Sequence, residues 1–461
     1  MSTTVQPLIP DAIAARSREF AELIMRRVAD PEVLRESLNS CTRNSANEFL
    51  WGGVSLLAGE TGTALAFRYT ARALGDTAGY WTGLAQQRLA AVVRATHDEP
   101  VGEPGMAGGT AGLALALADF AADDPRYLPA LAGLDAQLAA QLADLPAGHT
   151  TAGDGVAFDA YDAVSGLAGI LGHLVATPTA LRPEGAAVRA AARHLTAELV
   201  DLAGARTAEG RPAWYVPPRH YPLDSYRVEF PYGYVNLGLA HGVPAVLSAL
   251  ALALSAGEDT PGLAETVRRV ADYLLAVSFD DEWGRNWPTG IPLDAAGAEQ
   301  PSGLPAAPGE PARGLPRARA AWCYGAPGIA AALLNAADAL GDAELRAVAA
   351  DAFEAVLRRF AASDGFPSAT VCHGAAGLVV TGAEFARRTG SERITASLAG
   401  LTEHLLSHCS PDHPLGVKEL EQPGVLLDSP GILNGAEGVA LALWAVATPV
   451  EPRWTRALLI A

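Results

Sequence analysis

The chain has 461 residues, of which 50% are hydrophobic, and a formal net charge of −18 from 51 acidic and 33 basic side chains. This acidic balance argues against a nucleic-acid-binding protein, because such proteins carry basic surfaces. No run reaches the roughly 20 apolar residues of a membrane span, and residues 1–10 lack the basic and apolar segments of a secretory signal. We therefore expect a cytoplasmic protein without a membrane span.

The chain begins with two amphipathic segments, residues 12–28 and 31–38. Their periodicity predicts helices with one apolar face. We expect them to pack as an outer layer of the fold.

A short Gly-x-x-Gly motif then recurs along the chain, each time followed by an Ala/Leu-rich helical run. Glycine at the start of a helix allows the backbone to approach a neighbour where a Cβ would clash. The seven copies are Gly59–Gly62, Gly109–Gly112, Gly166–Gly169, a degenerate Gly242–Ala245, Gly325–Gly328, Gly374–Gly377 and Gly435–Gly438. An internal repeat of this kind predicts one structural unit per copy.

Segments between the copies, such as residues 265–277 and 342–360, have helical periodicity with one polar face. An apolar inner helix and an amphipathic outer helix in each repeat predict an all-α fold, an α/α toroid that forms a single domain over residues 1–461. In such a double ring, the starts of the inner helices and the loops before them would converge at one end. We expect the chemistry there.

Two insertions interrupt the repeats. Residues 204–236 are rich in aromatic residues and proline, and residues 281–318 are rich in proline and glycine. The second is typical of a surface loop. For the first, a surface loop and a lining for a peptide groove remain equally open.

Three repeat junctions carry residues that are able to bind a metal or transfer a proton. Cys323 precedes the fifth copy, Cys372 and His373 precede the sixth, and His241 precedes the fourth. If equivalent junctions meet at one end of a ring, Cys323, Cys372 and His373 form a Cys₂His set, which would bind zinc and leave a fourth position open. His241 fits a core histidine as well as a catalytic one. Asp162, at the third junction, is either a helix cap or a second inward-facing group.

The other cysteines and histidines show no such pattern. Cys41 and Cys409 are best interpreted as small packing residues. We interpret the remaining histidines as surface or packing residues: His97, His149, His173, His194, His220, His404, His408 and His413.

These motifs together resemble the lanthionine synthetase C-like family. The most specific match pairs Trp322-Cys323-Tyr324-Gly325-x-Pro327-Gly328 with Cys372-His373-Gly374-x-x-Gly377. Supporting matches extend from about Trp51 to Trp444 and include Tyr161-Asp162-x-x-Ser165-Gly166, His241-Gly242-x-Pro244 and Leu433-Asn434-Gly435. The chain departs from the family pattern at Ala245, where glycine is usual.

The resemblance implies an α/α toroid with zinc held by Cys323, Cys372 and His373. Within this family, the chain resembles the free-standing bacterial cyclases. Such enzymes act after a separate dehydratase has converted Ser and Thr of a precursor peptide to dehydro residues. We therefore expect a zinc-dependent cyclase that adds a cysteine thiol to dehydroalanine or dehydrobutyrine, forming lanthionine or methyllanthionine.

The reaction would need a thiolate and then a proton at the α-carbon. His241 is the candidate general acid, oriented or charge-balanced by Asp162. Arg319, Trp322 and Tyr324 are candidates for positioning the acyl unit or steadying the enolate. Two alternatives stay open: a glutathione transferase to dehydroamino acids, and a non-catalytic peptide-binding scaffold of a modification complex.

Overall fold

The computed structural model describes residues 7–40, 51–146, 148–151, 153–182, 185–304, 315, 318–363 and 365–461. Helices dominate these residues, and the six short strands among them form three two-stranded sheets. The chain divides into two compact units. Unit 1 comprises residues 1–103, 107–131 and 357–455, and unit 2 comprises residues 104–106, 132–356 and 456–461.

In every predicted copy of the glycine motif, a helix begins directly after the first glycine, and that glycine is the helix N-cap. These seven inner helices are α3 (Glu60–Leu74), α5 (Thr110–Ala121), α7 (Leu167–Ala176), α10 (Val243–Ser255), α12 (Ala326–Leu340), α14 (Ala375–Thr389) and α16 (Ala436–Ala447). Burial on all sides explains their Ala/Leu/Gly composition: all residues of α16 are buried.

At four copies the second glycine is required because the loop before the inner helix folds back tightly on the helix start. A Cβ on the second glycine of the motif would meet the carbonyl oxygen of the residue six positions earlier. That distance would be 2.3 Å at Gly62, 2.1 Å at Gly169, 2.3 Å at Gly328 and 1.8 Å at Gly438. These values are far below any real carbon–oxygen contact, so a side chain would force the loop away from the helix.

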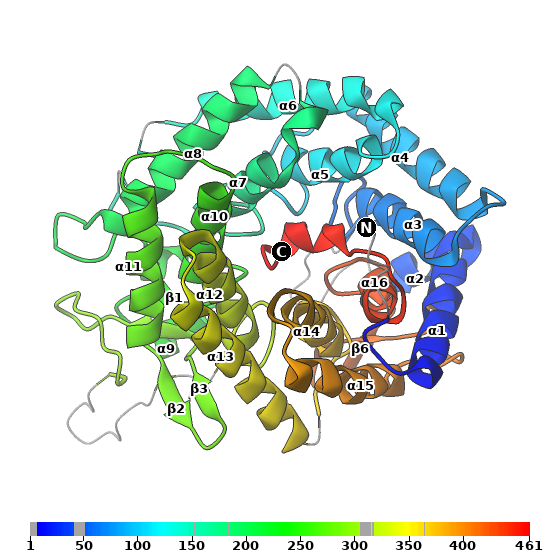
Figure 1. The fold of residues 1–461 in the computed structure, drawn as a ribbon. Coiled ribbons are helices and arrows are strands. Elements are labelled where there is room, and N and C mark those ends of the chain that lie inside the picture. The colour runs from blue at the N-terminus through cyan, green and yellow to red at the C-terminus, as the bar shows by residue number, and fades with distance from the viewer. Residues whose placement is uncertain are drawn as a thin grey trace. The chain divides into compact units, whose positions relative to one another are not determined.

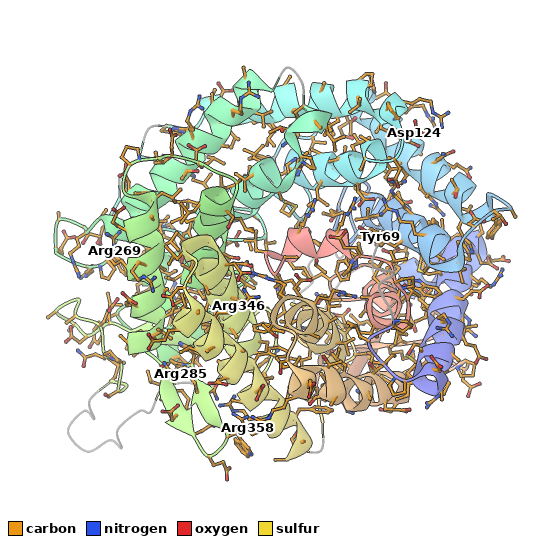
Figure 2. All side chains as sticks on the ribbon, viewed as in Figure 1. Tyr69, Asp124, Arg269, Arg285, Arg346 and Arg358 are labelled. Carbon is orange, nitrogen blue, oxygen red and sulfur yellow. The ribbon has the colours of Figure 1, made fainter. Side chains whose placement is uncertain are left out.

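The outer helices alternate with the inner ones along the chain. They are α1 (Asp11–Ala29), α2 (Pro31–Ser40), α4 (Tyr80–Asp98), α6 (Leu128–Ala143), α8 (Ala186–Gly204), α11 (Leu263–Ala276), α13 (Ala343–Ala361) and α15 (Glu392–Ser407). Helix α11 shows the expected pattern: Leu263, Val267, Val270 and Leu274 are buried along one face, while Arg269 is exposed (Figure 2). The amphipathic segments predicted from the sequence, including both N-terminal helices, are confirmed.

Unit 1 brings together the first helix and the last inner helix of the chain. Helix α1 packs against α16 and also contacts α3 and α15 (Figure 1). Arg18 of α1 donates to the carbonyl of Ala447 at the end of α16, 3.0 Å away. The first helix therefore serves as an outer partner of the last inner helix, as the sequence predicted. Within the same unit, α3 packs on α4, α5 and α16, and α14 packs on α15 and α16.

Unit 2 is built around α10, which packs against α7, α8, α11 and α12. The two predicted insertions are joined by a small antiparallel sheet, in which β1 (Tyr234–Asn236) pairs with β4 (Gly290–Pro292). The second insertion also contains the hairpin of β2 (Phe279–Asp281) and β3 (Gly284–Asn286). The first contains the short helix α9 (Ser225–Glu229). From the sequence we expected irregular insertions here. The pairing of strands from these two distant segments was not predicted.

The remaining short elements are the hairpin of β5 (Glu419–Gln422) and β6 (Val425–Leu427) and five 3₁₀ turns. These turns are η1 (Pro125–Tyr127), η2 (Phe158–Ala160), η3 (Thr179–Leu181), η4 (Pro218–His220) and η5 (Arg453–Leu458). Among the helices that could be described, none combines the length and the apolar character that crossing a membrane requires.

Candidate functional site

Backbone hydrogen bonds tie equivalent repeat junctions together within each unit. In unit 2, the Ala163 N–H donates to Ala240 O at 3.0 Å, and the Ala240 N–H donates to Cys323 O at 3.2 Å. In unit 1, the Cys372 N–H donates to Leu433 O at 2.9 Å, and the Leu433 N–H donates to Leu57 O at 3.0 Å. Apart from Ala163, each residue stands two positions before the glycine that caps its inner helix. The repeat argument that grouped the junction residues therefore has a structural basis within each unit.

Asp162 is 0% exposed and uses both of its carboxylate oxygens. Its Oδ1 accepts hydrogen bonds from the backbone N–H groups of Val164, Ser165 and Gly166, at 2.9, 2.7 and 2.8 Å. Its Oδ2 lies 2.6 Å from His241 Nδ1. Asp162 is therefore not the helix cap that the sequence offered as one alternative: its Oδ1 holds the loop before α7, whose N-cap Gly166 receives no side-chain cap. Its Oδ2 faces His241.

His241 is held in one orientation but stays accessible. Its Nδ1 faces the buried Asp162 carboxylate, while 30% of its side chain is exposed. The ring of Phe158 packs edge-on against the imidazole with 4.8 Å between centroids, and the ring of Tyr324 lies at 6.4 Å. Because a carboxylate accepts the Nδ1 hydrogen, Nε2 is left as the nitrogen that can exchange a proton with a substrate.

Cys323 lies in a tight turn that its neighbouring glycines make possible. Gly325 has φ +123°, and a Cβ there would lie 1.7 Å from the carbonyl oxygen of Arg319. A Cβ on Gly238 would lie 2.7 Å from the carbonyl oxygen of Cys323. Cys323 itself is 7% exposed. Two positions without side chains therefore fix the path of the backbone on both sides of this thiol.

Tyr324, next to Cys323, belongs to a network of phenols. Asn236, which is fully buried, donates through Nδ2 to Tyr324 Oη at 3.1 Å and to Tyr234 Oη at 3.2 Å. The side chain of Tyr324 also acts on Tyr226, where it opposes the rise in pKa that burial causes. Burial raises the pKa of Tyr324 well above its ordinary value, and the bond from Asn236 opposes that shift. The sequence did not single out Asn236, which precedes the fourth copy by several positions and matches no catalytic motif.

Cys372 and His373 occupy the matching junction of unit 1. The Cys372 backbone is fixed by its bond to Leu433 O, and Gly374 follows, where a Cβ would lie 2.4 Å from Ser368 O. Cys372 and His373 are both partly buried. Two side chains that could bind a metal thus stand directly before α14, as Cys323 stands before α12.

One ligand atom from each of Cys323, Cys372 and His373 lies within 4.8 Å of the other two, so this group could hold a metal ion. With bonds of about 2.0 Å to nitrogen and 2.3 Å to sulfur, a tetrahedral zinc ion holds its ligand atoms roughly 3.5 to 3.8 Å apart, which is within that limit. Among the described residues, no other set of three or more His, Cys, Asp or Glu residues meets this criterion. Two thiols and one imidazole are a donor set that suits zinc.

The other two predicted site residues lie differently. Trp322 is 2% exposed, and its Nε1 donates to Leu458 O at 2.9 Å, so its contacts are those of a packing residue. Arg319 is exposed, and its charge acts on Tyr226, where it opposes the rise in pKa that burial causes. Its carbonyl oxygen lies against Gly325 of the cysteine turn.

The aromatic stretch of the first insertion is largely a small core of its own. Val216, Phe230 and Tyr234 are buried together, and the rings of Phe230 and Tyr234 stack with 4.4 Å between centroids. Leu223 and Val228 of the same stretch are 56% and 65% exposed. A peptide groove lined by this segment stays a prediction.

The remaining histidines and cysteines fit the expected surface or packing roles where they are described. His173 is buried beside the ion pair of Arg182 and Asp135, and burial lowers its pKa well below the usual value. His404 and His408 both lie 3.0 Å from Phe366 O. Burial raises the pKa of Cys409 to about 12, so it stays a thiol. Cys41 lies outside the described residues.

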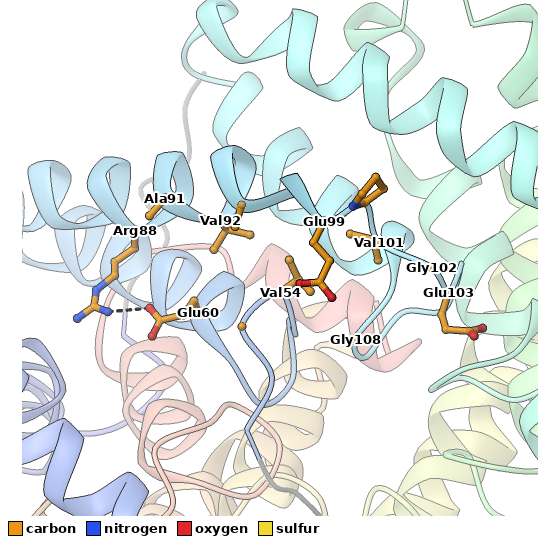
Figure 3. A pocket seen from close by; sticks show the side chains of 13 residues that line it. Val54, Glu60, Arg88, Ala91, Val92, Glu99, Val101, Gly102, Glu103 and Gly108 are labelled. Carbon is orange, nitrogen blue, oxygen red and sulfur yellow. Dashed lines mark hydrogen bonds and ion pairs between the residues drawn. The ribbon is translucent and has the colours of Figure 1, made fainter. Parts of the chain in front are cut away.

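Unit 1 also contains a cleft of about 640 Å³ between the start of α3 and the end of α4 (Figure 3). Val54, Val92 and Val101 line it, and Glu60 forms an ion pair with Arg88 at 2.7 Å. None of the site residues predicted from the sequence lines this cleft.

Comparison with known proteins agrees with these features. The model of the family described as "Lanthionine synthetase C-like protein" matches residues 51–459. A solved structure of nisin cyclase superposes with a TM-score of 0.73 at 19% sequence identity, covering 94% of this chain and 97% of that one. No curated protein matches the chain by sequence. The structural likeness shows the fold, the α/α toroid that the sequence predicted. The chain belongs to the lanthionine synthetase C-like family.

Proposed function

We propose that this protein is a zinc-dependent lanthipeptide cyclase, which joins a peptide cysteine to a dehydrated serine or threonine of the same peptide. The observation that carries the proposal is the group formed by Cys323, Cys372 and His373, in a chain of this family. The neighbour's name, nisin cyclase, supports a peptide substrate and a ring-forming reaction. A separate dehydratase would supply the dehydrated precursor, and the site of action would be the cytoplasm.

Cys323, Cys372 and His373 would hold the zinc ion. Three protein ligands leave a fourth position free, as in catalytic zinc sites. When bound, the ion would hold the peptide cysteine as a thiolate at neutral pH, where a free thiol with a pKa near 8.5 is mostly protonated.

His241, oriented by Asp162, would deliver the proton that the reaction requires. When the cysteine sulfur bonds to the β-carbon of the dehydro residue, the π electrons move onto the adjacent amide as an enolate. The α-carbon must then gain a proton, which replaces the one lost from the thiol. His241 Nε2 is placed to deliver it, because the Asp162 carboxylate engages Nδ1 at 2.6 Å and leaves Nε2 for the substrate.

Asp162→Asn tests this assignment with little structural disturbance. The amide oxygen can still accept the three backbone N–H groups, but the amide nitrogen would face His241 Nδ1 and donate to it. The imidazole would then carry its hydrogen on Nε2, which is the wrong tautomer, and would lose its carboxylate partner at Nδ1. We expect cyclisation to fall by about 10²- to 10⁴-fold, the range of general acid–base catalysis, and His241→Asn to fall by a similar factor.

Cyclisation leaves the peptide mass unchanged, so the assay counts free thiols of a dehydrated peptide by alkylation over time. Asp294→Asn is the matched control, because Asp294 Oδ1 also accepts two backbone N–H groups but faces no histidine; it should cyclise like the wild type. Wild-type rates in Asp162→Asn and His241→Asn would show the proton assignment to be wrong. A wild-type protein that binds no stoichiometric zinc would contradict the proposed function itself.

A further inference from the structure

Asn236 is a buried polar residue for which the fold makes special room. It ends β1 and pairs with Gly290 of β4, and it is 0% exposed. A Cβ on Gly242 would lie 2.3 Å from the Asn236 carbonyl oxygen and 2.7 Å from its Oδ1. The motif glycine beside His241 therefore also accommodates this side chain.

The orientation of the Asn236 amide is fixed by the backbone. Its Oδ1 accepts the Gly238 N–H at 2.8 Å. A backbone N–H can only donate, so a flipped amide would place N–H against N–H. Both hydrogens of Nδ2 must consequently point at the two phenol oxygens, Tyr324 Oη at 3.1 Å and Tyr234 Oη at 3.2 Å.

This arrangement determines where the hydroxyl hydrogen of Tyr324 goes. Because Tyr324 Oη accepts from Asn236, its own hydrogen has to be donated away from Asn236. In the free protein the neighbouring phenol of Tyr226 is available as an acceptor. Tyr324 is partly exposed, whereas Tyr234 is 2% exposed, so of the two phenols Tyr324 is the one that a peptide can reach.

We propose that Asn236 is a positioning residue, which holds the Tyr324 hydroxyl as an acceptor so that its O–H is donated to the reacting peptide. A carbonyl oxygen of the peptide would replace Tyr226 as the acceptor, and the hydrogen bond would strengthen as negative charge develops on that oxygen. This role rests on the proposed cyclase function. It uses no charge on Asn236 and no change in the protonation of Tyr324.

A double-mutant cycle separates positioning from general structural support. Asn236→Asp is isosteric and keeps an acceptor for the Gly238 N–H, but its other oxygen would accept the Tyr324 O–H and draw the hydrogen inward. We expect kcat for cyclisation to fall roughly a hundredfold, with KM little changed. In the Tyr324→Phe background the same substitution should change kcat by less than about twofold. Tyr234→Phe, which removes the other phenol oxygen, is the matched control and should retain the wild-type kcat.

A cost of Asn236→Asp that persists in the Tyr324→Phe background would overturn the proposal, because Asn236 would then act independently of Tyr324. A second readout needs no catalysis. The tyrosine Fermi doublet in the Raman spectrum reports whether a phenol oxygen accepts or only donates hydrogen bonds. The Tyr324 contribution is obtained by subtracting the spectrum of each matching Tyr324→Phe variant.

The Raman difference spectrum should change from the accepting to the donating form in Asn236→Asp. An unchanged doublet would overturn the proposed orientation. A wild-type protein without cyclase activity would instead contradict the proposed function, while the Raman comparison would still decide the hydrogen-bond arrangement. The two failures are therefore distinguishable.

Discussion

Substituting the second glycine of a repeat should destabilise the protein, although alanine is the better helix former. At Gly438, the third residue of α16, a Cβ would lie 1.8 Å from Ile432 O and 2.8 Å from Val371 Cγ2. Relief requires the buried carbonyl of Ile432, a residue 1% exposed, to move by more than an ångström. Overpacking of this kind costs up to about 3 kcal/mol. The higher helix propensity of alanine stabilises the helix by about 1 kcal/mol. The free energy of unfolding of Gly438→Ala should therefore be about 2 kcal/mol lower than that of the wild type.

Gly83→Ala provides the matched control. Gly83 lies within α4 and is exposed, and a Cβ there would meet nothing within 4 Å. The same substitution should therefore gain up to about 1 kcal/mol. Urea unfolding monitored by circular dichroism measures both variants, and the free energies of unfolding should differ by about 3 kcal/mol. A Gly438→Ala protein as stable as Gly83→Ala would refute the argument that close loop contact requires the motif glycines.

Two further substitutions probe the metal loop and a buried acid. Gly325→Ala should lower the zinc content measured by atomic absorption, because its Cβ would meet Arg319 O at 1.7 Å. Gly341→Ala is the control, since Gly341 also has a positive φ but a Cβ there would meet nothing within 4 Å, and this variant should retain zinc. An equal loss of zinc in both variants would contradict this reasoning. Burial raises the pKa of Glu437 well above the usual value, so the folded state keeps a proton that the unfolded chain releases above about pH 4.3. Wild-type stability should consequently fall as pH rises above about 4.3 toward the raised pKa of Glu437, and Glu437→Gln should remove that part of the fall. Parallel pH profiles of the urea midpoint would show that Glu437 is not responsible.

The inner helices and the metal group were predictable because both follow from a local pattern that repeats. Each glycine motif marks a loop that folds back on a helix start, and Cys323 and Cys372 stand at the same place within it. Asp162 and His241 were chosen as candidate site residues for the same reason, because they also stand at repeat junctions. Their hydrogen bond could not be derived from the sequence, because it depends on how neighbouring repeats pack.

What the sequence missed depends on contacts between distant segments. Asn236 acquires its environment from β4, from Tyr234 and from Tyr324, and nothing in its immediate neighbours indicates a shared hydrogen bond. The pairing of the two insertions was missed because β1 and β4 are only three residues each, too short for an alternating pattern. Trp322 lies in the most specific motif, yet its indole bonds to Leu458 O, near the end of the chain.

The pairing of α1 with α16 has a consequence for biosynthesis. Arg18 and Ala447, which bond across this pair, are 429 positions apart. Because α16 cannot be covered by α1 before it has been made, unit 1 must wait for the ribosome to finish almost the entire chain. The continuous segment 132–356 of unit 2 can emerge and fold earlier. We expect a long-lived nascent intermediate in which α1 is already synthesised but unpaired, and slow closure of unit 1 as the last step.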